Sequence, residues 1–358
     1  MNKKKWFYIL KISCFSFLTA LIAFLISIII NSYLLYNKLS NIYQIFLQNA
    51  LIDNQTFQNI LRTGLENQTN NKNLTFLILG LDSLEKRTSP PLTDSILILN
   101  INLEKQKINL LSLPRDLYLK DYKSKINALY YYEQQQQKPQ MATEIISSLI
   151  QKPIDYTVIL QLNQIKELID LIGGLDINLQ HSFIDKKFPL ENVDFDLEKN
   201  PEKWYETIEF QAGFQTLSGK QTLQYMRSRY SQDAEGNDQS RNQRQQEIIK
   251  AFVPNLINKI YQPKKNPNLL DFALLGKLWN FYQTNFNQYF SIQDLITLTA
   301  DIIQNKKINF NFNQCYLTIY PDSNDGVLFS PPVQKYQQWV YEIYRPQEFN
   351  KLIQQCWQ

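Results

Sequence analysis

FLILGL at residues 76–81, SILILNI at 95–101 and KINLLSL at 107–113 are three short apolar runs that decide the fold class. Continuous apolar runs of this length are typical of strands that are covered on both faces. Only NLEKQ, residues 102–106, separates the second run from the third, which predicts a hairpin. We therefore expect a central sheet with at least one antiparallel pair.

Strand and helix patterns alternate along the rest of the chain. We predict helices at 141–150, 163–172 and 218–226, a long helix from about 241, and strands at 155–160 and 176–179. Beyond residue 263 we predict helices at 269–282, 291–304 and 332–344, and a strand at 315–319. This order predicts an α/β protein, with a three-layer α/β/α domain around a central mixed sheet.

Composition excludes some classes of protein. The chain has 358 residues, of which 44% are hydrophobic and 13% aromatic, so it is long and apolar enough for a packed core and is not disordered. Its net charge is only +4, from 37 basic and 33 acidic residues. A balance this even does not indicate a nucleic-acid-binding surface, and we expect no nucleic acid partner.

The N-terminus indicates a membrane anchor. Lys3–Lys5 precede residues 12–30, 19 positions without a charge, and such a stretch can span a hydrocarbon core of about 30 Å. No cleavage site of the small-x-small kind follows it. We expect a cytoplasmic N-terminus at 1–11, one transmembrane helix at 12–36 and a stalk at 37–73, with a helix around 42–61. Because the lysines mark the cytoplasmic end, the rest of this cell-membrane protein is expected to be extracytoplasmic. There Cys315 and Cys356 could form a disulfide, and the sequence leaves that pairing open.

A cluster of arginines indicates an anion site. It comprises Arg227, Arg229, Arg241 and Arg244, with Gln245 beside them. Asp238 or Ser240 is expected to cap the long helix, which places two of the arginines near its N-terminus, where the helix dipole repels cations and attracts anions. A phosphate group would explain that placement, since the guanidinium fork binds phosphate oxygens in pairs. The alternative is the solvated basic face of an ordinary amphipathic helix.

Two aspartates form a candidate metal site. Asp82 ends the first apolar strand and Asp94 begins the next. If these two strands are neighbours, both carboxylates meet at one edge of the sheet. Carboxylates together with phosphate oxygens are ligands that Mg²⁺ prefers. Arg115 lies at the end of the third strand. The alternative is that the aspartates serve only as turn and cap residues.

Missing motifs narrow the chemistry further. His181 is the only histidine, and no G-x-S-x-G occurs, which leaves little room for a Ser-His-Asp hydrolase. No G-x-x-x-x-G-K-[ST] is present, so the chain is not a P-loop nucleotidase.

Six segments, in this order and spacing, resemble the LytR–CpsA–Psr family. They are FLILGLDS (76–83), LTDSILILNINLEKQKINLLSLPRDLYL (92–119), KINALYYYE (125–133), PIDYTVILQLNQIKELIDLIGGLDINL (153–179), FQTLSGKQTLQYMRSR (214–229) and DQSRNQRQQEII (238–249). The resemblance runs from about residue 74 to 260 and continues more weakly towards 345. It implies a catalytic core at 74–262 and a C-terminal part of the same domain at 263–358.

The resemblance also implies an activity and a site. Such proteins are Mg²⁺-dependent transferases that move a glycopolymer from a polyprenyl-pyrophosphate carrier to a peptidoglycan hydroxyl and form a phosphodiester. Asp82 and Asp94 match the family's metal site; Arg115, Arg227 and Arg229 match its catalytic arginines; Asp238, Arg241 and Gln245 match the segment that closes its pyrophosphate pocket. We assign Arg244 to substrate binding with them.

The chain departs from the family at two positions. Many members have arginine where Leu84 and Leu92 stand here, and Arg87 could replace one of them. For this reason a non-catalytic polyprenyl-pyrophosphate or glycan binding protein, or a polyprenyl pyrophosphatase, remains an alternative. The general base is also left open among Asp82, Asp94 and Asp116.

Overall fold

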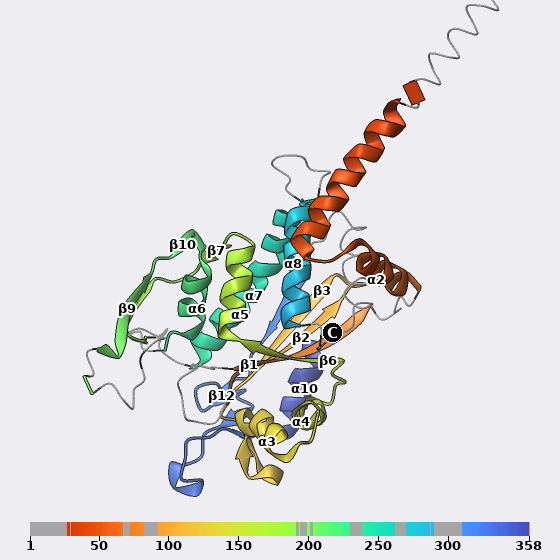
Figure 1. Ribbon diagram of the computed structural model, residues 1–358. Helices are drawn as coiled ribbons and strands as arrows, with labels where there is room; N and C mark the ends of the chain where they lie inside the picture. The colour runs from red at the N-terminus through yellow and green to blue at the C-terminus, as the bar shows by residue number, and fades with distance from the viewer. Residues whose placement is uncertain are drawn as a thin grey trace, which may run out of the picture.

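The computed structural model describes residues 27–28, 30–66, 72–81, 92–190, 193, 199–200, 203–229, 238–261, 270–286, 288–289 and 310–357 (Figure 1). Most of the predicted membrane segment lies outside these residues, as do the predicted helix at 291–304 and Asp82, Leu84 and Arg87. Within the described part of the chain, no helix combines the length and the hydropathy that crossing a membrane requires.

The centre of the molecule is a five-stranded mixed sheet of order β11-β3-β2-β1-β6. Its strands are β1 (Asn73–Leu81), β2 (Thr93–Asn102), β3 (Lys107–Leu113), β6 (Tyr156–Gln161) and β11 (Asn311–Cys315). The pairs β1–β2 and β2–β3 are antiparallel, which confirms the predicted hairpin. The pairs β1–β6 and β3–β11 are parallel. The predicted mixed sheet is therefore correct, and the C-terminal segment contributes one of its strands.

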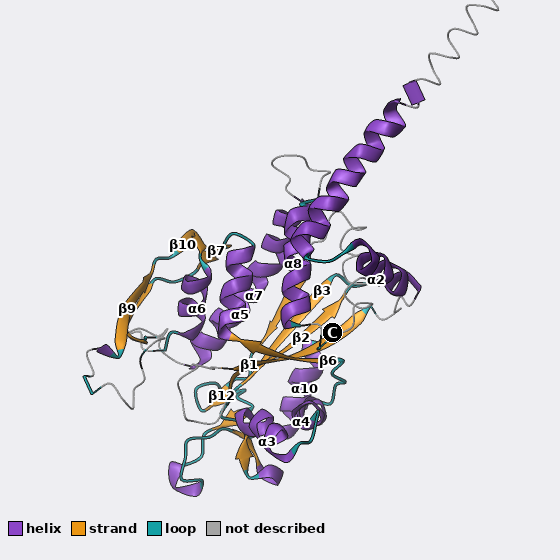
Figure 2. Ribbon diagram, in the orientation of Figure 1, coloured by secondary structure: helices purple, strands orange, loops and turns teal. Residues whose placement is uncertain are grey.

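Helices cover both faces of this sheet (Figure 2). One face carries α5 (Leu162–Leu171), α7 (Asp238–Tyr261) and α8 (Phe272–Asn285), and the other α3 (Leu129–Gln136), α4 (Met141–Ile150) and α10 (Pro346–Cys356). Helix α6 (Gly219–Arg227) packs beside α5 and α7. Side chains alternate between the faces: Ile98 packs in the cluster that contains Ile146 and Phe349, and Leu97 in the one that contains Ile249. Burial on both sides explains why the strands are continuous apolar runs.

A lobe beside the sheet was largely absent from the sequence prediction. It consists of β7 (Leu175–Leu179) paired with β10 (Gly213–Leu217), and β8 (Phe183–Pro189) paired with β9 (Tyr205–Phe210). Only β7 was predicted. The lobe and helices α6 and α7 share an apolar cluster that includes Phe183, Phe188 and Tyr225. The lobe thus packs directly against the C-terminal half of α6.

Segments near the ends of the chain depart from the sequence predictions. The predicted helix at 332–344 is wrong: the segment holds a 3-10 turn, Val333–Lys335, and β14 (Glu342–Ile343). Gln337 has a φ of 54°, which a right-handed helix excludes. The main chain of Tyr341 instead exchanges hydrogen bonds with residues 116 and 118. The predicted strand at 315–319 is replaced by the end of β11 and the short β12 (Ile319–Tyr320), and the helix at 42–61 is interrupted at 51–53.

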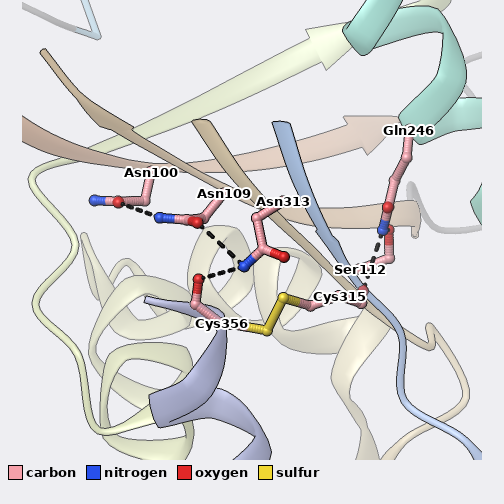
Figure 3. The surroundings of a disulfide bond; sticks show 7 residues. All are labelled: Asn100, Asn109, Ser112, Gln246, Asn313, Cys315 and Cys356. Carbon is pink, nitrogen blue, oxygen red and sulfur yellow. Dashed lines mark hydrogen bonds between the residues drawn. A yellow bond between two sulfur atoms is a disulfide. The ribbon is translucent and has the colours of Figure 1, made fainter. Parts of the chain in front are cut away.

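Cys315 and Cys356 form a disulfide, with 6.0 Å between their Cα atoms (Figure 3). It joins the end of β11 to the end of α10. Beside it, the Asn313 side chain donates a hydrogen bond to the carbonyl of Cys356 (2.9 Å), and the Gln246 amide of α7 donates to Ser112 Oγ (3.0 Å) on β3. The C-terminal segment is therefore fixed to the sheet that carries the predicted site.

Candidate functional site

One half of the candidate site lies where β1 ends and β2 begins. Leu81, the last residue of β1, pairs with Thr93, so Asp94 is placed at the carboxyl end of β1. Thr93 is buried and its hydroxyl donates to the carbonyl of Asn127 (3.1 Å), which holds this end of β2 in place. Because Asp82 lies outside the described residues, the meeting of the two aspartates stays a prediction.

Arg115 and Asp94, both predicted site residues, are in direct contact. Arg115 Nη1 lies 2.5 Å from Asp94 Oδ1, and its Nε lies 3.3 Å from Asp116 Oδ2. Lys125 Nζ is 2.6 Å from the other oxygen of Asp116. The Asp94 and Arg115 side chains are 32% and 25% exposed, so a ligand can reach this cluster of two cations and two carboxylates.

The donors at this edge suit Mg²⁺ that is bound together with phosphate. Among the residues that the structure describes, no three His, Cys, Asp or Glu side chains are grouped to hold a metal ion. Mg²⁺ does not need such a cage, since it commonly binds one or two carboxylates and completes its shell with water and substrate phosphates. The accessible carboxylate of Asp94 fits that pattern, and Arg115 supplies a cation beside it for the phosphates.

The other half of the site is the C-terminal end of α6. Arg227 is the last residue of this helix, Ser228 is its C-cap and Arg229 follows. Both arginines are partly buried, and the Arg227 guanidinium lies 5.7 Å from the centroid of the Phe188 ring. The R-S-R pair is thus presented on a helix end that packs against the β8–β9 lobe.

Arg244 supports this helix end from α7. Only 2% of it is exposed, and it donates hydrogen bonds to the carbonyls of Tyr225 (2.9 Å, from Nε) and Ser228 (2.5 Å, from Nη2). Its guanidinium also lies 5.0 Å from the centroid of the Phe183 ring. A cation is well placed at the carbonyl end of a helix. These contacts position the R-S-R segment; substrate binding by Arg244 itself stays a prediction.

Helix α7 brings the two halves together. Gln245, next to Arg244, accepts a hydrogen bond from Ser95 Oγ (2.8 Å), and Ser95 adjoins Asp94 on β2. Arg244 reaches α6 and Gln245 reaches β2, because neighbouring residues of a helix project about 100° apart. Helix α7 thus contacts both the strand that carries Asp94 and the helix end that carries Arg227 and Arg229. A single site formed by all the predicted residues stays a prediction.

The first turn of α7 holds the two other predicted residues. Arg241 is 5% exposed and lies one turn before Gln245. The helix begins at Asp238, three residues before the predicted start at about 241, and the Asp238 side chain lies outside the described part of the chain.

A small pocket of about 40 Å³ lies beside this region. Pro114, which precedes Arg115, lines it together with Asn242 of α7 and the side chains of Tyr316 and Tyr341. Burial, and then the negative charge of Glu247, raise the pKa of the Tyr316 phenol above its ordinary value of 10.0. Tyr316 thus keeps its proton and can donate a hydrogen bond across the neutral pH range.

Sequence reasoning missed two residues of this region, Ser95 and Asp185. Asp185 is completely buried in β8 and contacts the R-S-R segment. One signal for it exists in the sequence, because Phe183 and Asp185 are two residues apart and a strand places such residues on the same face. An aspartate in register with a core phenylalanine is unusual, since buried charges require partners.

The chain matches a known protein family. The model of the LytR_cpsA_psr family matches residues 37–336. The chain belongs to this family. Two similar relatives are the polyisoprenyl-teichoic acid–peptidoglycan teichoic acid transferases TagV and TagU of Bacillus subtilis. TagV is 27% identical over 188 residues, which cover 51% of this chain and 43% of TagV. TagU is 22% identical over 229 residues, which cover 63% of this chain and 62% of TagU. The chain thus spans about half the length of the curated relatives that it matches.

A solved structure has the same fold. It is an Enterococcus faecalis protein described as a transcriptional regulator, which aligns with a TM-score of 0.54 and 18% identity over 80% of this chain and 86% of that protein. The LytR_cpsA_psr match includes every predicted site residue. It also includes Leu92, two residues before Asp94, whose side chain is 38% exposed where many family members have arginine.

Proposed function

We propose that this LytR_cpsA_psr family protein transfers a glycopolymer from a polyprenyl-pyrophosphate carrier to a peptidoglycan hydroxyl, with formation of a phosphodiester. The observation that carries the proposal is the junction made by α7, where Gln245 contacts β2 beside Asp94 while Arg244 holds the R-S-R end of α6. The names of the relatives TagV and TagU, both teichoic acid transferases that act on peptidoglycan, support the same reaction.

The arginines would bind the pyrophosphate. Arg115, Arg227, Arg229 and Arg241 are contributed by three separate segments of the chain. Guanidinium groups bind phosphate oxygens in pairs and keep their charge at every physiological pH. They can therefore neutralise the negative charge of the pyrophosphate, which otherwise repels the oxygen of the acceptor hydroxyl. Their principal contribution is electrostatic, because phosphoryl transfer depends on positioning and charge stabilisation more than on covalent chemistry.

Asp82 and Asp94 would hold Mg²⁺, with Asp94 accessible at the strand edge. When bound, the ion would neutralise charge on the phosphate oxygens. Arg115 would remain beside Asp94 and limit the repulsion between its carboxylate and the phosphates.

The reaction exchanges one phosphorus–oxygen bond for another. The acceptor hydroxyl oxygen bonds to the phosphorus next to the sugar, the bond from that phosphorus to the bridging oxygen breaks, and polyprenyl phosphate leaves. The hydroxyl proton passes to a carboxylate, for which Asp82, Asp94 and Asp116 remain the candidates. Asp116 accepts a hydrogen bond from Lys125 Nζ (2.6 Å).

Two observations support placement at the outer surface of a cell membrane. The helix over residues 30–50 exposes apolar side chains at its beginning, among them Tyr33, Leu34 and Tyr36, as a helix that continues from a membrane would. The disulfide Cys315–Cys356 suits an oxidising, extracytoplasmic compartment. An anchor at 12–36 would keep the site near the lipid carrier.

A second candidate function is hydrolysis or simple retention of the polyprenyl pyrophosphate. The exposed Leu92, in place of an arginine, favours this alternative because it removes a cation beside Asp94. A weaker cationic pocket could bind the carrier without activating it for attack by a sugar hydroxyl.

The experiment that tests the proposal uses the full-length protein in lipid vesicles with a radiolabelled polyprenyl-pyrophosphate glycan, Mg²⁺ and peptidoglycan. Label attached covalently to peptidoglycan supports transfer, whereas free phosphorylated glycan shows hydrolysis and unchanged carrier shows retention only. Arg229→Lys should abolish most transfer. Arg345→Lys is the matched control, because Arg345 lies over the rings of Tyr320 and Tyr344 and is not among the arginines assigned to the pyrophosphate.

A further inference from the structure

Asp185 is a completely buried carboxylate in the middle of β8. Strand pairing with β9 shifts between Asp185 and Phe188, so that β8 accommodates one more residue than β9 over this interval. The shift keeps Phe183, Asp185 and Phe188 inside the lobe while Lys186 and Lys187 are exposed. A charged group therefore occupies a position where the apolar cluster of the lobe would otherwise continue.

Burial of this carboxylate is compensated by the R-S-R segment. Asp185 Oδ2 accepts hydrogen bonds from Ser228 Oγ (2.7 Å) and from the main-chain N–H of Arg229 (3.1 Å). Its Oδ1 accepts from the N–H of Lys187 (2.9 Å). A buried carboxylate without such donors would be strongly unfavourable, so the position of Asp185 and that of the segment are linked.

Two buried charges fix a single peptide unit. The peptide between Ser228 and Arg229 donates its N–H to Asp185 of β8, and its carbonyl accepts from Arg244 of α7. Both of its polar groups are thus bound by side chains of opposite charge from different elements. This arrangement defines the orientation of the peptide that separates Arg227 from Arg229.

We propose that Asp185 is a positioning residue for the pyrophosphate clamp. It holds the turn between Arg227 and Arg229 in one conformation, so that both guanidinium groups are in place before the ligand arrives; this inference rests on the proposed binding of pyrophosphate by these arginines. Two adjacent cations repel each other in the absence of a ligand, and a flexible turn would let them separate. Displacement of a binding group by about 1 Å can cost on the order of a hundredfold in rate.

The test compares three variants of the full-length protein in binding a short-chain polyprenyl pyrophosphate by calorimetry. Asp185→Asn replaces one acceptor oxygen with an amide, and Ser228→Ala removes one donor without changing any charge. Asp170→Asn is the matched control, because Asp170 accepts the N–H of Gly219 (2.7 Å) at the opposite end of the same helix. Steady-state transfer by each protein is measured in parallel.

We expect about tenfold or greater loss of affinity in Asp185→Asn, a smaller loss in Ser228→Ala and none in Asp170→Asn. The KM for the lipid substrate should rise in the first two, whereas a variant that merely unfolds more easily would show a lower apparent kcat at unchanged KM. If Asp185→Asn does not fold, the affinity of Ser228→Ala for the same lipid decides the test.

Affinity within twofold of the wild-type value in the folded variants would overturn the inference. Equal weakening by Asp170→Asn would overturn it as well, since general loosening of α6 would then explain the effect. The proposed function is judged separately, by the wild-type protein: binding without transfer rejects the reaction and leaves the role of Asp185 intact, and failure to bind the probe rejects both.

Discussion

Arg115 and Asp94 form an ion pair across the loop that follows β3, with 2.5 Å between Nη1 and Oδ1. The arginine of the P-R-D motif thus lies against the carboxylate that we assign to Mg²⁺. Arg115 also contacts Asp116, so two carboxylates share its guanidinium group. The pair links the metal half of the proposed site to the phosphate half.

Asp94→Asn should abolish the Mg²⁺ dependence of transfer and reduce its rate by at least about tenfold, since a neutral amide binds Mg²⁺ poorly. The free energy of unfolding should change by no more than about 1 kcal/mol, because the pair is partly exposed. Rates measured across a series of Mg²⁺ concentrations, with thermal unfolding alongside, check this. The control is Asp121→Asn, an exposed aspartate in the 3-10 turn Lys120–Tyr122. A variant with normal rate and normal Mg²⁺ response would remove Asp94 from the metal site.

Arg229→Lys should lower transfer by at least about tenfold, because a point charge cannot reproduce the paired hydrogen bonds of guanidinium to phosphate. Stability without ligand should hold or rise slightly, since functional sites often trade stability for activity. Added polyprenyl phosphate should raise the melting temperature less than in the wild-type protein. Full activity, or a marked fall in the melting temperature of the unliganded variant, would show that Arg229 is structural.

Arg244→Lys, unlike Arg229→Lys, should lower the stability of the unliganded protein. Its guanidinium is buried and bonds two carbonyls at the end of α6, and lysine cannot donate to both from the same position. We expect a loss of about 2–3 kcal/mol in the free energy of unfolding, measured with urea. Unchanged stability combined with weaker pyrophosphate binding would instead assign Arg244 to the substrate.

The disulfide should contribute substantially to stability. It closes the loop between Cys315 and Cys356, which are 41 positions apart in the sequence. The chain-entropy model gives about 4 kcal/mol for a loop of this size. We expect the double variant Cys315→Ser/Cys356→Ser to lose most of this free energy of unfolding, measured with urea. Its stability should equal that of the reduced wild-type protein. Equal stability of the oxidised and reduced proteins would contradict the prediction.

Glu342 should make part of the stability dependent on pH. Burial opposes ionisation of this carboxyl, but hydrogen bonds from Lys335 and Lys120 outweigh it and hold the pKa below its ordinary value of 4.5. Because the folded pKa is the lower one, the contribution is complete above the unfolded pKa and disappears as the pH falls through the folded pKa. Glu342→Gln should therefore be less stable than the wild-type protein at neutral pH, and the difference in stability should shrink as the pH falls into the acid range. The control is Glu348→Gln, at an exposed position, which should be as stable as the wild-type protein. A constant difference at every pH would contradict this assignment.

The sequence predicted those parts of the fold that local patterns determine. The strands β1, β2 and β3 are apolar runs with a short connection, and α6 is preceded by Ser218, whose side chain accepts the N–H of Gln221. The segment at 332–344 was mispredicted because its main chain pairs with residues 116–118, which no local pattern reveals. Strands β8 and β9 were missed, and the irregular pairing near Asp185 interrupts the alternation that would have indicated them.

The candidate site, like the fold, could be predicted from the sequence only in part. The sequence predicted the pairing of β2 with β3 and left that of β1 with β2 open. The second pairing places Asp94 at the strand edge where Arg115 meets it. Asp185 depends on a contact between residues 43 positions apart, and its role becomes visible only when β8 is packed against α6. Arg244 was recognised as part of the cluster, but its contact with the carbonyl of Ser228 could not be inferred from spacing.

The most direct measurement of the central claim follows the phosphorus atoms. A polyprenyl-pyrophosphate glycan labelled with ³²P only at the phosphate next to the sugar is incubated with the full-length protein, Mg²⁺ and peptidoglycan, and the wall material is then digested to muropeptides. The account predicts labelled muropeptides that carry the glycan through a phosphodiester, together with unlabelled polyprenyl phosphate. Label found only in free glycan phosphate, or only in intact carrier, would contradict it.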